Sequence, residues 1–122
     1  MAECVIYCRR VNNSGIVRHR GKIEAVINNA KRAREMVNQE GSLAAYFWRY
    51  EAAAGRLAAP QTVSTSDESV ALSKALKKMG WKFVGPTTVY AFLQAMGLVN
   101  DHIESCVVRT EVERARRNFK RP

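Results

Sequence analysis

Apolar residues from Ile16 onward recur every three or four positions, the spacing that lines up side chains on one face of an α-helix. This face consists of Ile23, Val26, Ile27, Ala30 and Val37. Basic residues fall mostly on the opposite side, namely Lys22, Lys31, Arg32 and Arg34. The pattern predicts an amphipathic helix that ends at Gly41, since glycine is a typical helix stop. Residues 1–13 show no clear periodicity.

Shorter patterns follow this helix. Ser42 is a typical N-cap for a short aromatic helix that contains Tyr46, Phe47 and Trp48. Residues 55–64 have the composition of a loop. The run Thr65-Ser66-Asp67-Glu68 has the spacing of a capping box and predicts that a helix begins there and ends at Gly80. Its predicted buried residues are Val70, Leu72 or Ala71, Ala75, Leu76 and Met79.

The next predicted helix begins at Gly85-Pro86, because the missing N–H of proline has no intrahelical partner in a first turn anyway. It runs to about Met96, ends at Gly97 and buries Tyr90, Phe92 and Met96. Asp101, with Glu104 three residues on, predicts a further helix start, and a cap is favoured over a catalytic carboxylate there. No strand pattern is longer than residues 82–84. The chain is therefore predicted to be all-α, a helical bundle.

Length and charge restrict the class of protein. A chain of 122 residues is typical of one domain. The formal net charge of +9 favours polyanions, and among them nucleic acid, although a basic protein without such a partner stays an alternative. No apolar run of 18 residues and no signal-peptide core are present, so we expect no membrane partner and a cytoplasmic location. Three cysteines without an export signal argue against a disulfide scaffold.

The segment between the two predicted helices makes residues 70–97 a candidate helix-hairpin-helix motif. Such a hairpin offers backbone N–H groups to a phosphate, and glycine permits the close approach. We expect Phe83 and Val84 to tuck between the helices. The DNA-binding residues predicted here and in the basic cluster upstream are Lys78, Gly80, Lys82, Val84, Gly85, Thr87, Thr88, Arg18 and Lys22. The alternative is an ordinary turn between helices, which often carries glycine.

Long blocks of this chain resemble one known family. They are GIVRHRGKIEAVINNAK (15–31), the aromatic run 46–48, and LSKALKKMGWKFVGPTTVYAFLQAMGLVNDH (72–102). From Gly15 to Cys106 the chain resembles the C-terminal portion of the DNA-3-methyladenine glycosylase I family. The resemblance implies base-excision repair of alkylated double-stranded DNA, in which a damaged nucleotide is flipped out and its N-glycosidic bond is hydrolysed. Because 3-methyladenine is cationic and leaves readily, little general acid catalysis is needed.

The chain departs from the family at its start. The family's N-terminal segment carries a Tyr-His-Asp-x-Glu-Trp-Gly motif and a glutamate that contacts the alkylated base, and neither is found in this sequence. The chain therefore looks like a family member shortened in its first half, and its catalytic residues are unknown. A non-catalytic DNA-binding remnant and a basic helical interaction protein remain alternatives. A shortened bundle should expose apolar faces such as the Ile23/Ile27 stripe, so we expect self-association.

Two residues near the C-terminus suggest a metal site. His102 and Cys106 are four positions apart, so on a helix both could face one metal ion. The resemblance implies that they form half of a structural zinc site. Cys4 corresponds in order to the family's N-terminal cysteine, and Cys8 lies one turn further on, which would make a Cys3His set. Alternatively, Cys4 and Cys8 belong to an unrelated start sequence and the site is incomplete.

The resemblance divides the chain into three parts. Residues 1–14 form a divergent N-terminal segment, residues 15–108 the glycosylase-like helical domain, and residues 109–122 a basic tail. The tail carries Arg114, Arg116, Arg117, Lys120 and Arg121, looks helical but highly charged, and is expected to be mobile and to add non-specific affinity for DNA. Trp48 and Trp81 are expected to pack in the structure and not to stack on bases.

Overall fold

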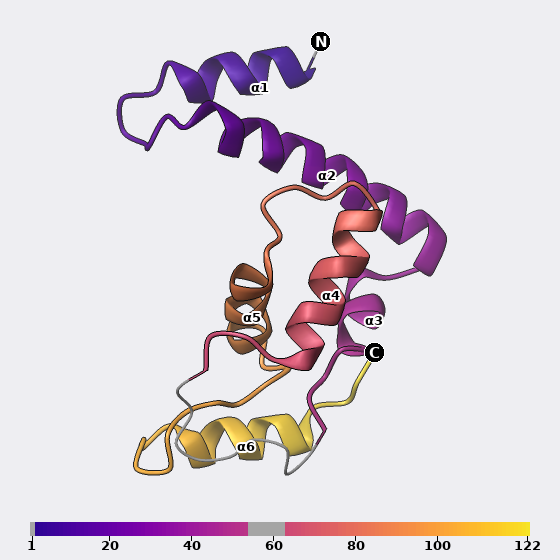
Figure 1. The fold of residues 1–122 in the computed structure, drawn as a ribbon, viewed down its shortest axis with the longest axis vertical. Coiled ribbons are helices and arrows are strands. Elements are labelled where there is room, and N and C mark those ends of the chain that lie inside the picture. Colours follow the sequence, from indigo (N-terminus) through magenta and orange to yellow (C-terminus); the bar gives the residue numbers. More distant parts are fainter. Residues whose placement is uncertain (1, 54–62) are drawn as a thin grey trace.

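The computed structural model describes residues 2–53 and 63–122. Within these ranges all regular structure is helical, as predicted (Figure 1). The helices are α1 (Ala2–Val11), α2 (Arg20–Glu40), α3 (Leu43–Trp48), α4 (Asp67–Lys78), α5 (Pro86–Ala95) and α6 (Arg109–Asn118). Most of the predicted loop at 55–64 lies outside the described residues. None of the helices among the described residues is long and apolar enough to cross a membrane.

The local cap and stop signals define most helix ends. Gly41 closes α2 with φ 81°, and the Ser42 hydroxyl accepts a hydrogen bond from Ala45 N at the start of α3. Gly85 and Pro86 open α5, and Gly97 follows its end with φ 76°. The start of α2 is different from the prediction. It begins at Arg20 and not at Ile16, because the His19 side chain caps it by accepting from Lys22 N at 3.1 Å.

The capping box of α4 is present but shifted by one residue. Ser66 Oγ accepts from Ser69 N at 3.2 Å, and Ser69 Oγ accepts from Ser66 N at 2.8 Å. The predicted pair was Thr65 and Glu68. Ser69 is fully buried, so a short side chain whose hydroxyl bonds locally fits this position, whereas a glutamate would leave a charge inside.

The core lies where α4 and α5 pack together, with α3 and one end of α2 beside them. It consists of Met36, Tyr46, Leu72, Leu76, Val89, Tyr90, Leu93, Leu98 and Val99. Trp48 and Trp81 pack against this core, as expected. Met96 was predicted to be buried and is 55% exposed, because it follows the last residue of α5 and lies beyond the packed face.

The apolar face predicted for α2 is only partly correct. Ile23 is buried together with Ala25, but Val26 is 63% exposed. The reason is that α2 has two packing partners. Its C-terminal half reaches the core through Met36, whereas its N-terminal half packs against α1 (Figure 1). Residues 2–11 are therefore helical although their sequence shows no periodicity. Packing against α2 stabilises this helix and outweighs the weak local pattern.

The segment between α5 and α6 also departs from the prediction. No helix begins at Asp101, because its carboxylate accepts hydrogen bonds from the Tyr90 hydroxyl, at 2.9 Å, and from the Gln94 side chain. Burial and, next, this hydrogen bond raise the pKa of Tyr90 to about 12. The next helix starts at Arg109, so residues 101–108 are not helical.

The expected mobile tail is packed onto the rest of the chain. Glu51 pairs with Arg116 at 3.1 Å and with Arg121 at 2.6 Å. Phe119 stacks on Trp48 with ring centroids 4.8 Å apart. We call these five residues the C-terminal latch. Its guanidinium groups lower the pKa of Glu51, the Arg121 hydrogen bond being the largest cause.

Candidate nucleic-acid interface

Residues 79–85 connect α4 to α5, and hydrogen bonds to α4 hold this connection near both of its ends. We call this connection the α4–α5 turn. Trp81 N donates to Leu76 O at 3.0 Å, and Ser73 Oγ donates to Val84 O at 2.6 Å. These bonds fold the beginning and the end of the turn back onto α4, so the turn has a defined shape.

Two asparagines on α2 hold the same turn from the other side. Asn28 Nδ2 donates to Gly80 O at 2.8 Å. Asn29 bonds both backbone groups of Lys82, donating to its O at 2.8 Å and accepting from its N at 2.9 Å. This clamp was not predicted from the sequence. A signal was present, because two adjacent asparagines are unfavourable inside a helix and therefore call for another role.

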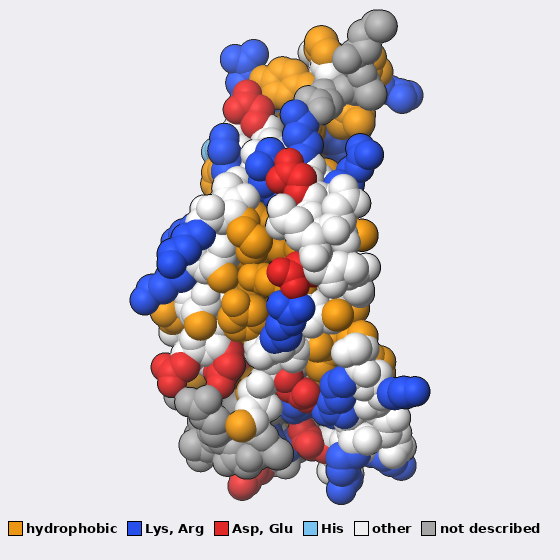
Figure 2. Space-filling view, turned by 90° about the vertical axis from the view of Figure 1, so that its right-hand side faces the viewer, with side chains coloured by type: hydrophobic (Ala, Val, Ile, Leu, Met, Phe, Trp, Pro, Cys, Tyr) orange, Lys and Arg blue, Asp and Glu red, His pale blue; other side chains and the backbone are white. Residues whose placement is uncertain are grey.

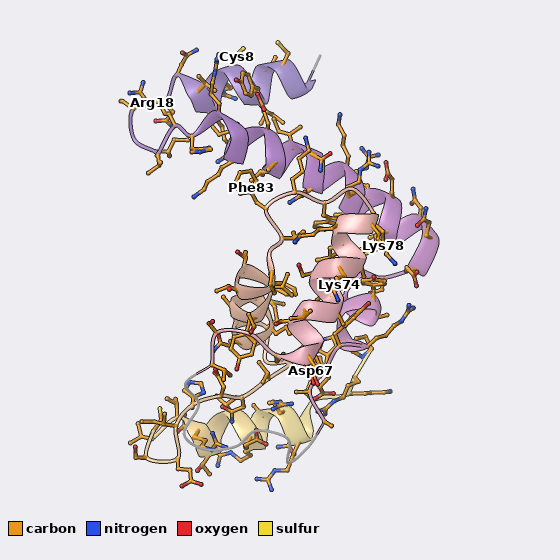
Figure 3. The ribbon with its side chains drawn as sticks, in the orientation of Figure 1. Cys8, Arg18, Asp67, Lys74, Lys78 and Phe83 are labelled. Carbon is orange, nitrogen blue, oxygen red and sulfur yellow. The ribbon has the colours of Figure 1, made fainter. Side chains whose placement is uncertain are left out.

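Phe83 does not tuck between the helices as predicted. Its side chain is 57% exposed and its φ is 56°, a left-handed conformation that is uncommon for a bulky residue. The bonds of Lys82 to Asn29 and of Val84 to Ser73 fix the backbone on both sides of it. Phe83 therefore points away from the core, toward the N-terminal part of α2, where its ring meets His19 edge-on at 6.2 Å (Figure 3). Val84 is half-buried, which fits the prediction better.

A groove of about 400 Å³ runs between α2 and the turn. It is lined by Lys22, Ala25, Val26, Asn29, Lys82, Phe83 and Thr88. The fold thus brings together three predicted DNA-binding residues from two separate segments: Lys22, Lys82 and Thr88. We call this the Lys22–Lys82 groove. An apolar hollow of about 260 Å³ adjoins it and shares Phe83, Asn29 and Thr88 with it, and Val84 lines this hollow.

Other predicted residues lie around the groove. Lys78 and Gly80 line a separate hollow of about 390 Å³, together with Arg32 and Glu35, which pair at 2.9 Å. Arg18 is exposed on the connection between α1 and α2 (Figure 3). Among the described residues that line these three hollows, Glu35 is the one carboxylate. Lys and Arg side chains are spread along the molecule and are not confined to one patch (Figure 2).

The N-terminus of α5 opens beside the groove. Gly85 is its N-cap and makes no side-chain cap hydrogen bond, and Pro86 occupies the first turn. The N–H groups of Thr87 and Thr88 therefore begin a helix whose dipole is positive at this end, and both threonines are exposed. Gly85 has an ordinary φ of −63°, and a Cβ added to it would meet nothing within 4 Å. The fold itself does not require glycine at this position.

The structure does not bring the predicted zinc ligands together. Cys4 and Cys8 lie on α1, whereas His102 and Cys106 lie between α5 and α6, at the opposite end of the molecule (Figure 1). His102 Nδ1 lies 2.7 Å from Asn100 Oδ1, the kind of contact that orients the ring of a metal-binding histidine. The described residues nevertheless contain no group of three or more His, Cys, Asp or Glu side chains arranged to hold a metal ion. They do not complete the expected site.

Comparisons with known proteins agree with the residues that carry the resemblance. The model of the methyladenine glycosylase family matches residues 6–110, so the match includes part of α1. DNA-3-methyladenine glycosylase 1 of Escherichia coli (strain K12) is 43% identical over 102 residues, which cover 80% of this chain and 54% of that protein. The chain thus spans about half the length of this relative.

Solved structures give the same result. A crystal structure of 3-methyladenine DNA glycosylase I is 42% identical, with a TM-score of 0.72 over 83% of this chain and 58% of that one. The structure of 3-methyladenine DNA glycosylase I from Staphylococcus aureus, solved to explain 3-methyladenine recognition, is 33% identical with a TM-score of 0.73, over 84% of this chain and 57% of that one.

Proposed function

The chain belongs to the methyladenine glycosylase family, and we propose that it acts in DNA base-excision repair, in the hydrolysis of the N-glycosidic bond of 3-methyladenine in alkylated duplex DNA. Its relatives carry the name DNA-3-methyladenine glycosylase. A DNA substrate is in keeping with the net charge of +9. The cytoplasmic location expected from the sequence and the expected self-association remain predictions.

Within that activity, the α4–α5 turn and the start of α5 are proposed to act as a helix-hairpin-helix that binds a phosphate. Lys22 and Lys82 supply charge from the two sides of the groove, and Thr88 supplies a hydroxyl. The observation that carries this proposal is the presence of glycine at position 85. Neither the backbone angles nor the neighbouring atoms of Gly85 require a glycine there. A phosphate oxygen approaching the N–H groups of α5 gives a reason for a residue without a side chain.

These contacts fix the protein on the DNA backbone and do not read the base. The departing base is cationic, so its release needs little help from an acid. The three hollows around the turn agree with this. Among their described lining residues the only carboxylate is that of Glu35, which is already paired with Arg32. The same observation favours a second candidate function, DNA binding without base release.

One pair of assays separates these functions. Methylated duplex DNA is incubated with the folded protein, and the free bases are separated and counted. Duplex binding is measured in parallel at several salt concentrations. Release of 3-methyladenine above the protein-free rate supports the glycosylase. Salt-dependent binding without release assigns the second function. Absence of binding even at low salt overturns both and leaves a basic helical interaction protein.

A further inference from the structure

Two thiols on α1 have no part in the Lys22–Lys82 groove. Cys4 and Cys8 are four residues apart on one helix, so their side chains share a face. Both are exposed and free. The Cys4 thiol is also the largest cause of the raised pKa of Cys8. The helix therefore holds the two thiols one turn apart before anything binds.

The residues around Cys4 and Cys8 restrict which metal ion the two thiols can bind. No third His, Cys, Asp or Glu completes a metal-binding group with them in the described part of the chain. Structural zinc sites need four ligands, so a pair is a poor zinc site. Soft thiolates select Cu(I) over harder cations, and a monovalent soft ion is satisfied by few ligands.

We propose that Cys4 and Cys8 form a two-thiolate site for a soft monovalent cation of the Cu(I) class. Binding breaks two S–H bonds, releases two protons to solvent and forms two metal–sulfur bonds, with no change of oxidation state. The product carries one net negative charge. Arg9 and Arg10, in the last turn of the same helix, are exposed and supply opposite charge nearby.

A metal bridge across one turn has a structural consequence. It restrains α1 as a helix, and short isolated helices are marginal without such support. Because α1 packs on the N-terminal half of α2, the bound ion should raise the melting temperature of the reduced protein. Figure 3 labels Cys8 on α1, the helix that packs against α2.

The test is a titration of the reduced protein with Cu(I) in the absence of oxygen, in competition with a coloured Cu(I) chelator. The wild type and the matched control Cys106→Ser should each take one Cu(I) per chain. Cys4→Ser and Cys8→Ser should each bind at least about tenfold more weakly, a loss of about 1.4 kcal/mol. Both altered cysteines are exposed, so circular dichroism should show an unchanged helix content.

Three results would overturn the proposal. The first is unchanged Cu(I) affinity in the Cys4→Ser/Cys8→Ser double variant. The second is loss of binding in Cys106→Ser, which would move the site to the other end of the molecule. The third is one Cu(I) ion shared by two chains in gel filtration, which would make the pair half of an intermolecular site. None of these measurements uses DNA, so their result is independent of the glycosylase proposal.

Discussion

The α4–α5 turn and the C-terminal latch both join segments that are far apart in the sequence, but by different chemistry. The turn is held by neutral amide and hydroxyl groups, such as those of Asn29 and Ser73. The latch is held by ion pairs around Glu51 and by an aromatic stack. Neutral contacts leave Lys82 of the turn and Lys22 across the groove available to a ligand, whereas the latch uses its arginines internally. The net charge of +9 is therefore not equally available to a ligand in the two regions, the turn and the latch.

The largest expected effect is on DNA binding when the charges of the groove are reversed. The Lys22→Glu/Lys82→Glu double variant should bind duplex DNA about 100-fold more weakly at low salt, and the slope of log affinity against log salt should fall by about 2. Fluorescence anisotropy with a labelled duplex measures both quantities.

The matched control reverses two exposed charges beside the latch, Arg117→Glu and Lys120→Glu. It changes the net charge of the protein by the same amount. If this control weakens binding as much as the groove variant does, DNA affinity depends on total charge. The charges of the turn and of the latch would then be equally available to DNA.

The second effect concerns the clamp that shapes the turn. Asn29→Ala removes the two hydrogen bonds to Lys82, and we expect a loss of about 1–2 kcal/mol in the free energy of unfolding. DNA affinity should fall as well, because Lys82 and Phe83 lose their fixed positions. Chemical denaturation is compared with that of Asn38→Ala, an exposed asparagine on the same helix. Equal stability of the two variants would show that the clamp contributes nothing.

Local chemistry made some of this structure predictable. Gly41, Ser42 and Pro86 act through groups within a few residues, so a short stretch of sequence contains all the information for those helix ends. Lys22, Lys82 and Thr88 were also selected from local sequence, and the structure places them in one groove; their role in DNA binding stays a prediction.

Other features depend on partners far along the chain. Asn29 and Lys82 are 53 residues apart, and Glu51 and Arg116 are 65 apart. A solvated Arg116 and a latched Arg116 have identical sequence surroundings. The charged pattern of residues 109–122 therefore predicted a mobile tail, although long-range ion pairs and the Trp48 stack fix it to the chain.

A third, smaller effect tests the aromatic part of the latch. Phe119→Ala removes the ring that stacks on Trp48, and we expect a loss of about 1 kcal/mol in stability with unchanged DNA affinity. Thermal unfolding measures the loss. Val107→Ala is the control, because Val107 is 91% exposed and its truncation removes little packing. A Phe119→Ala protein as stable as this control would mean that the stack contributes nothing to stability.

The smallest effect should be the pH dependence of the ionic part of the latch. The folded pKa of Glu51 lies below its ordinary value of 4.5, so the folded protein binds fewer protons there than the unfolded chain does. The stabilisation is complete above pH 4.5 and is lost as the pH falls through the lower folded pKa. The Glu51 side chain is only 21% exposed, so solvent screens the pair incompletely. Glu51→Gln should melt a few degrees lower than the wild type near pH 7.

That difference between the wild type and Glu51→Gln should shrink on acidification, because the wild type loses its carboxylate charge while the variant has none to lose. Glu111→Gln, at an exposed position on α6, controls for acid effects that any glutamate would show. A melting-temperature difference that stayed constant from neutral to acidic pH would mean that Glu51 acts in the latch by packing alone. The turn and the latch would then differ only in which residues hold them, because neither region would depend on ion pairs.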